Sequence, residues 1–280
     1  MPPDRWRRRT GGRAVASGSG FRLMTLALPH RAALVASSVA DLRPEQALNR
    51  CVRGLLTALR RVGVDPIYPG LDAVTAGGRT LAAVSLAESS DGVTLFQAVL
   101  AWSESFAQTP ALLDRADPEG LVPMALAAAS SFTCVAALSR GALSLDLGSF
   151  AARIGEGYRE SSHVDVVPCA PPPATITADE APAAGVEPPP DAGTATRQGR
   201  IGPVTAWVRR DRDVLCDAGV FGDLMAPISL PAELGRRVAG VAPDRGSLRS
   251  ALTGWLDGRE RYLLGITEAE LIDLLAEAAA

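Results

Sequence analysis

The side chains that most often carry out chemistry are few and scattered in this sequence. There are two histidines, His30 and His163, so a metal site built from three histidines is impossible. The cysteines form neither a CxxC pair nor a cluster with histidine; they are Cys51, Cys134, Cys169 and Cys216. Scattered cysteines in a chain of 280 residues indicate reduced, intracellular thiols. Each is either a small buried hydrophobic group or a reactive thiol, and burial is the commoner case. We expect no metal site.

Lysine is absent from the chain. All 28 basic residues are arginines, so any mechanism that depends on a lysine of this protein is excluded. The acidic residues number 31, and the formal net charge is −3. This balance argues against a nucleic-acid partner, because nucleic-acid binders present a basic face. No apolar run reaches the roughly 18 residues that a transmembrane helix needs, so we expect no membrane partner.

The N-terminal arginines raise the question of export. The run from Arg7 to Arg9, followed by the apolar residues 21–28, partly resembles a twin-arginine signal. However, Arg13 and Arg22 interrupt the pattern, and Pro29 ends the apolar run early. The sequence therefore predicts a cytoplasmic location.

Hydrophobic patterning predicts an α/β (α+β) fold for the first part of the chain, with flanking helices around a mixed or antiparallel central sheet. Residues 21–28 are almost continuously apolar, which is typical of a buried strand. Apolar residues at three- and four-residue steps predict a helix over 44–62. The segments 73–75 and 79–85 flank Gly77-Gly78, as the arms of a hairpin do. A strand over 93–102 and a helix over 147–158 follow.

The composition changes over residues 169–200. Two triple-proline runs lie there among Ala, Gly, Thr and acidic residues, and such a stretch cannot bury enough apolar area to offset its ordering entropy. It predicts an exposed linker between a domain over 1–168 and a small α+β module over 201–280. In that module we expect strands over 204–208 and 214–221 and three helices, at 232–238, 247–256 and 268–278. The last helix begins with a capping box, formed by Thr267 and Glu270.

A segment rich in arginine and glycine carries a family resemblance. Residues 7–15, Arg-Arg-Arg-Thr-Gly-Gly-Arg-Ala-Val, resemble the Arg-Arg-x-[Ser/Thr]-Gly-Gly-Gly-x-Val signature of the lipoate–protein ligase A family. Other segments are similar to the family in the same order: 49–50, 63–65, 68–74, 78–83, 95–100 and 219–224. The resemblance implies a biotin/lipoate ligase-like catalytic domain followed by the family's C-terminal accessory domain. It covers the chain except for the linker.

This resemblance implies ATP-dependent attachment of lipoate or octanoate to a lysine of a lipoyl carrier domain. ATP and Mg²⁺ would take part without any integral cofactor, and the partners would be the carrier protein and the small acyl ligand. Adenylation needs positive charge and backbone N–H groups around the phosphate, and a glycine-rich loop can supply the N–H groups. The nucleotide- and acyl-binding residues that the resemblance implies are Arg8, Thr10, Gly11, Gly12, Arg13, Ala14, Val15, Ala16 and Asp72.

Several positions depart from the family's pattern. Thr80 stands in place of the catalytic lysine that bridges the phosphate and the acyl carboxylate. Loss of one such preorganised donor costs on the order of 10² to 10³ in rate. Arg79 cannot take over, because neighbouring strand residues face opposite sides, and Arg13 replaces the signature's third glycine. The family also has strands and a helix before the signature, so we expect an N-terminally incomplete catalytic domain: either the true start lies upstream of Met1 or the acyl pocket lacks part of its wall.

Three hypotheses stay open at this point. The chain is an ATP-dependent ligase, a non-catalytic relative that binds a carrier domain or an acyl ligand, or a fragment that does not fold stably. The missing lysine argues against activity. The glycine-rich segment could also be a flexible loop, the arginine run a solvated charge cluster, and Asp72 a turn cap.

Overall fold

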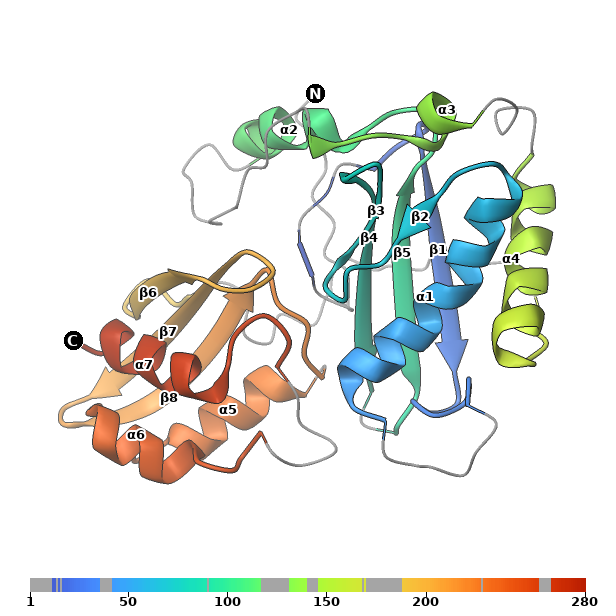
Figure 1. The fold of residues 1–280 in the computed structure, drawn as a ribbon. Helices are drawn as coiled ribbons and strands as arrows, with labels where there is room; N and C mark the ends of the chain where they lie inside the picture. The colour runs from blue at the N-terminus through green and yellow to red at the C-terminus, as the bar shows by residue number, and fades with distance from the viewer. Residues whose placement is uncertain are drawn as a thin grey trace.

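The fold is taken from a computed structural model that describes residues 12–13, 15, 17–35, 42–89, 91–116, 131–139, 146–167, 169, 188–227, 229–256 and 263–280. Within these ranges the chain forms a five-stranded sheet and a three-stranded sheet, each with its own helices and hydrophobic core (Figure 1). All described strand pairs are antiparallel. The expected α+β class is confirmed.

The larger sheet has the strand order β1-β5-β4-β3-β2. Its strands are β1 (Phe21–Leu28), β2 (Pro66–Ile67), β3 (Ala73–Ala76), β4 (Arg79–Glu88) and β5 (Thr94–Ala101). The expected hairpin is β3–β4. Gly77 and Gly78 connect its arms with φ values of +57° and +74°, which a two-residue turn of this kind requires and glycine adopts at no steric cost.

Strand β1 has the expected bounds but not the expected burial. Within the described chain it pairs with β5 alone and lies at the edge of the sheet. Leu26 and Leu28 are buried, whereas Leu23 is 60% exposed. The prediction of a fully buried strand is therefore wrong. A nearly continuous apolar run carries no alternation, so its sequence could not reveal that one face is solvated.

Helices α1 (Pro44–Arg61) and α4 (Leu147–Ser162) pack together and against one face of the sheet (Figure 1). They approach closely through glycines. A Cβ at Gly54 would lie 2.6 Å from the ring of Tyr158, and a Cβ at Gly157 would overlap the carbonyl oxygen of Gly54. The Tyr158 hydroxyl donates a hydrogen bond to the carbonyl oxygen of Cys51, so the buried polar tip of this side chain is satisfied.

The sequence did not predict three short elements, which are η1 (Phe106–Gln108), α2 (Thr109–Ala116) and α3 (Val135–Leu138). Elements η1 and α2 pack against the other face of the sheet, whereas α3 contributes Val135 to the helix-side core and packs Ala136 against the other face. Val99 and Ala101 point to this face, since Ala98 and Leu100 belong to the core on the helix side. Together with Phe21, Phe106 and Cys134 they form a small apolar cluster, the second-face cluster.

The C-terminal module contains β6 (Gly193–Gln198), β7 (Pro203–Asp211) and β8 (Val214–Gly222) in that spatial order. Its helices are α5 (Leu230–Val238), α6 (Arg245–Leu252) and α7 (Glu268–Ala278), close to the three expected ones. Strand β6 lies inside the range 169–200, where composition predicted a linker. Its polar sequence becomes a strand because it pairs with β7 along its whole length, and cross-strand pairing decides such cases more than local propensity does.

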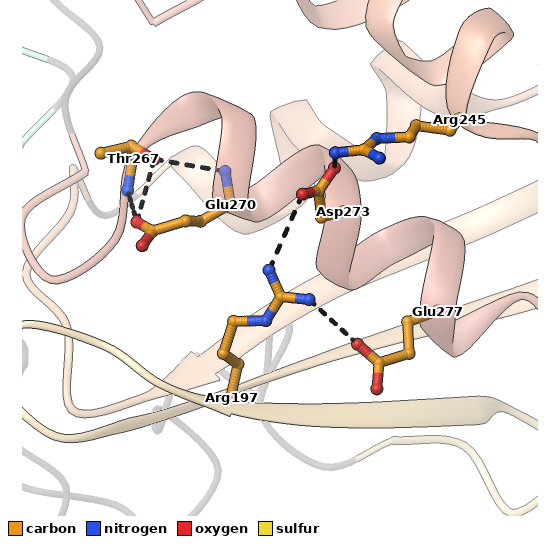
Figure 2. A network of polar contacts seen from close by, with 6 residues as sticks. All are labelled: Arg197, Arg245, Thr267, Glu270, Asp273 and Glu277. Carbon is orange, nitrogen blue, oxygen red and sulfur yellow. Dashed lines mark hydrogen bonds and ion pairs between the residues drawn. The ribbon is translucent and has the colours of Figure 1, made fainter.

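A polar network fixes β6 to the helices of the module (Figure 2). Arg197 of β6 pairs with Glu277 at 3.2 Å and with Asp273 at 3.8 Å, and Arg245 of α6 reaches Asp273 at 2.5 Å. The predicted capping box of α7 is present, with the Thr267 N–H 2.7 Å from Glu270 Oε2 and the Glu270 N–H 3.2 Å from Thr267 Oγ1.

The two modules share apolar contacts. Ile201 and Met225 of the C-terminal module belong to the core of the first module, and Leu264 packs against that core. The main chains of Met225 and Leu264 form an antiparallel β-bridge, with two hydrogen bonds of N···O distance 2.9 and 2.8 Å. The C-terminal module therefore contributes side chains to the core of the first. No described helix is long and apolar enough to cross a membrane.

Candidate functional site

The N-terminal glycine–arginine segment runs across the boundary between the two modules. Gly12, at φ +80°, donates its N–H to the carbonyl oxygen of Leu224 at 2.7 Å. Arg13 turns toward the first module, and Val15 packs against the second-face cluster. Three described residues of one short segment thus contact the C-terminal module, the start of β3 and the far face of the sheet.

Arg13 forms a two-bond ion pair with Asp72. Its Nη2 lies 2.9 Å from Asp72 Oδ1, and its Nε bonds to Asp72 Oδ2. The side chain of Asp72 is 1% exposed and that of Arg13 is 27% exposed. Burial by itself would lower the pKa of the Arg13 guanidinium, but hydrogen bonding and charge from Asp72, with the charge of Asp223, raise that pKa. The guanidinium therefore stays charged and is committed to a buried carboxylate.

Asp72 has a second neighbour in Tyr68. The Tyr68 hydroxyl donates to the carbonyl oxygen of Leu71 at 2.6 Å. Burial, followed by the negative charge of Asp72, raises the pKa of Tyr68 well above its usual value. Tyr68 is therefore a neutral hydrogen-bond donor at neutral pH.

Asp223 approaches Arg13 from the C-terminal module. It is buried at the end of β8, and its N–H donates to the carbonyl oxygen of Pro203 at 2.8 Å. A Cβ at Gly202 would overlap its carboxylate, so this position requires glycine. Ile201 precedes Gly202. Arg13 Nη2 donates a long hydrogen bond, 3.4 Å, to the carbonyl oxygen of Ile201. Arg13 therefore lies between carboxylates that belong to different modules.

Thr80 lies on the second face of the sheet. The β3–β4 register shifts between Val74 and Thr75, so that Thr80 pairs with Thr75 while Arg79 pairs with Ala76. Ala76 belongs to the core on the helix side, and paired residues share a face. The register thus places Arg79 and Thr80 on opposite faces, as the sequence predicted.

The main chain of Thr80 is joined to the segment before α3. Its carbonyl oxygen accepts the N–H of Thr133 at 3.0 Å. The Thr133 hydroxyl is buried, with the residue 3% exposed, and has no hydrogen-bond partner among the described residues. An unsatisfied buried hydroxyl costs free energy unless a ligand or water pairs with it. Sequence reasoning missed Thr133, and the only signal was its place in a Ser/Thr/Ala-rich stretch.

A polar row crosses the same face of the sheet. Thr25, Gln97 and Ser85 lie opposite one another on β1, β5 and β4. Gln97 Nε2 donates to Thr25 Oγ1 at 3.2 Å, and Ser85 is fully buried. The rows on either side are apolar, and one of them contains Val99 of the second-face cluster. This face therefore carries a polar row between apolar rows.

Comparison with known proteins bears on the fold. No protein-family model matches the sequence, and no curated protein matches it significantly. Among solved structures, P. falciparum LipL1 in complex with lipoate superimposes with a TM-score of 0.54 and 10% identity, covering 87% of this chain and 69% of that chain. The fold is lipoate ligase-like.

Two further solved structures match shorter stretches of the chain. Ta0514 of T. acidophilum with bound lipoic acid gives 16% identity and a TM-score of 0.41 over 57% of this chain. Lipoate-protein ligase A bound with ATP gives 16% identity and a TM-score of 0.41 over 58%. The chain spans 59% and 60% of the length of these two proteins. The similarity to LipL1 confirms the fold that the sequence resemblance implied.

The lipoate ligase-like fold brings together some of the predicted site residues. Of the predicted set, Gly12, Arg13, Val15, Asp72 and Thr80 are described, and Arg13 meets Asp72. Among the described residues no hydrogen bond joins Thr80 to that pair; Thr80 is tied to Thr133 instead. The other predicted residues lie outside the described ranges: Arg8, Thr10, Gly11, Ala14 and Ala16.

Three described side chains of the predicted set, those of Arg13, Asp72 and Thr80, do not suit ATP with Mg²⁺. The Arg13 guanidinium is bonded to Asp72, and Thr80 carries no charge. Mg²⁺ prefers carboxylate oxygens together with phosphate, but Asp72 is paired with a cation. Within the described ranges no three His, Cys, Asp or Glu side chains gather as a metal site would need.

Proposed function

We propose that this lipoate ligase-like protein binds an acyl ligand of the lipoate or octanoate class without activating it with ATP. The observation that carries the proposal is the Arg13–Asp72 ion pair. In this pair the Arg13 guanidinium is already bonded to a carboxylate. Thr80, in place of the family's lysine, carries no charge.

Charge is the basis of the argument against activation. Forming an acyl adenylate brings a carboxylate onto a phosphate, so two negative groups must approach each other, and fixed positive charge is what lowers that barrier. The sequence contains no lysine. Of the two described arginines closest in sequence to this site, Arg79 faces the other side of the sheet, and release of Arg13 would leave the buried Asp72 without its cation, which is costly.

The second face of the sheet supports acyl binding. The Thr133 hydroxyl is buried without a described partner and can donate to a carboxylate or amide oxygen. The stacked rings of Phe21 and Phe106, with centroids 5.2 Å apart, belong to the adjacent apolar cluster, which matches the chemistry of a hydrocarbon chain. LipL1, which has a similar fold, is a lipoate complex. A lipoyl group carried on a protein as an amide is neutral and needs no cation, so a lipoyl carrier domain is the proposed protein partner.

Calorimetry and mass spectrometry test this proposal together. Lipoate, octanoate and lipoamide are titrated into the protein, and the same ligands are incubated with ATP and Mg²⁺ and analysed for the acyl adenylate. We expect binding of an acyl ligand and no adenylate. A robust adenylate signal that Arg8→Ala abolishes would overturn the proposal.

A matched pair of variants locates the ligand. Thr133→Val removes the buried hydroxyl while keeping the shape of the side chain, and we expect it to weaken acyl binding about tenfold, the worth of one hydrogen bond. Thr253→Val removes a hydroxyl that bonds within α6 and should leave binding unchanged. Equal effects of both variants would place the ligand elsewhere.

ATP-dependent ligation is the second candidate. The lipoate ligase-like fold favours it, as does the run of arginines and glycines before Ala14. The adenylate measurement separates the two candidates, because only ligation requires that intermediate.

A further inference from the structure

The contacts of Gly12 and Arg13 join the two modules at one point. Gly12 bonds to Leu224, on the C-terminal module, through its main chain. Arg13 bonds to Asp72, in the first module, and to the carbonyl oxygen of Ile201, in the second. The segment that in the family resemblance would cradle a phosphate thus bonds to both modules.

Apolar burial accompanies these polar contacts. Two residues of the C-terminal module lie in the core of the first module: Ile201 and Met225. Ile201 precedes Gly202, which lies against the Asp223 side chain, and Met225 follows Asp223 by two residues. The Met225–Leu264 bridge presents both of its side chains to that core. The polar and apolar contacts therefore lie on adjacent residues and form one interface.

The charges at this interface divide between the modules. Asp72 belongs to the first module and Asp223 to the second, and both raise the pKa of Arg13. One guanidinium thus interacts with buried carboxylates on either side. If the modules separated while Arg13 stayed with Asp72, the hydrogen bond to Ile201 and the attraction of Asp223 would be lost.

We infer that Arg13 is a positioning residue that holds the C-terminal module against the first, so that the two move as one body. The inference does not depend on the proposed function. It explains why this chain has an arginine at position 13, where the signature of the lipoate–protein ligase A family has its third glycine. It also explains why a carboxylate as buried as Asp72 is tolerated, since a buried charge must be paired.

A cleaved but otherwise complete chain tests the inference. A site-specific protease sequence is inserted between residues 170 and 187, the folded chain is cut, and association of the two parts is measured by sizing over a dilution series. The wild-type parts should stay together. Arg13→Met keeps the aliphatic stem and removes the charge, so it loses the hydrogen bond to the Ile201 carbonyl oxygen in the other part. It should raise the dissociation constant about tenfold, as expected for one charge-assisted hydrogen bond.

Two further variants make the result specific. Arg61→Met removes an exposed guanidinium that pairs with Glu156 and Glu160 inside the first module and should leave association unchanged. The double variant Arg13→Met with Asp72→Asn removes both charges of the buried pair, so it should fold even where Arg13→Met does not, and it should still weaken association.

Energy transfer in the uncut chain gives a second readout. Cys169 and Cys216 are exposed, whereas Cys51 and Cys134 are buried, so the two exposed thiols accept a dye pair without any substitution. Arg13→Met should broaden the distance distribution and Arg61→Met should not. Unchanged association and unchanged distance in both Arg13 variants would overturn the inference, as would separation of the wild-type parts on cleavage.

Discussion

Gly157 of α4 lies directly over the main chain of Gly54 in α1, and an added Cβ at Gly157 would overlap the Gly54 carbonyl oxygen. The contact has backbone on one side, so no side-chain movement can relieve it. The two helices that cover the sheet are therefore held at a separation that depends on these glycines.

Gly157→Ala should lower the free energy of unfolding by about 2–4 kcal/mol, because helix α4 must shift away from α1 and open the core. Gly155→Ala, on the same helix, is the control: its Cβ would lie 3.6 Å from the nearest atom, the carbonyl oxygen of Val166. That variant should be neutral or stabilise by up to about 1 kcal/mol through helix propensity. Urea unfolding followed by circular dichroism measures both, and an equal loss in the two would contradict the steric argument.

Thr267→Ala should destabilise the C-terminal module by about 1 kcal/mol through loss of the α7 cap. Hydrogen bonds from the Thr267 backbone N–H and hydroxyl lower the pKa of Glu270 below its ordinary 4.5. A carboxyl whose folded-state pKa is depressed stabilises above its unfolded-state pKa and loses that stabilisation as pH falls through the folded value. The difference between wild type and Thr267→Ala should therefore be full above about pH 4.5 and shrink below it. A difference that stays constant down to pH 2 would show that the Glu270 carboxylate is not involved.

Thiol reactivity should divide the four cysteines into two pairs. Burial raises the pKa of the Cys51 thiol to about 12, so at pH 8 it is both uncharged and inaccessible. Cys134 is buried as well, and Cys169 and Cys216 are exposed. A chromogenic disulfide reagent should titrate two thiols in the native protein and four in denaturant. Rapid reaction of Cys51 in the native state would contradict the burial of α1.

Thr80→Lys should improve binding of a non-hydrolysable acyl-adenylate analogue by roughly 10- to 10²-fold, the worth of a charge-assisted hydrogen bond. The same lysine at the exposed Thr253, at the end of α6 in the C-terminal module, is the matched control for added charge. Arg13→Gly, alone and combined with Thr80→Lys, asks whether the ion pair with Asp72 blocks the nucleotide. If binding is unchanged in every variant, this chain has no nucleotide site.

Limited proteolysis should locate the connection between the modules more narrowly than composition did. A glutamate-specific protease should cut first at Glu180, within the proline-rich stretch. Trypsin should spare Arg197, which lies in β6 and pairs with α7. Early tryptic cleavage at Arg197 would place β6 outside the folded module.

Local sequence patterns were enough for the elements whose signals lie within a few residues. Helix α1 was predicted from its apolar spacing, the β3–β4 hairpin from Gly77-Gly78, and the start of α7 from Thr267 and Glu270. Each of these is fixed by torsion angles and hydrogen bonds between near neighbours. The absence of lysine is likewise a property of the sequence alone.

Tertiary structure decided what depends on residues far apart in the chain. The polar strand β6 forms because it pairs with β7. Strand β1 is half exposed because it lies at the edge of the sheet. Position 157 requires glycine because the main chain of Gly54 lies against it. From sequence, Asp72 was either a binding residue or a turn cap, and Arg13 was a binding residue that replaces the signature's third glycine. Only the fold brings these two side chains together across 59 positions, because the free energy of a buried charge depends on the partner it meets and not on its neighbours in sequence.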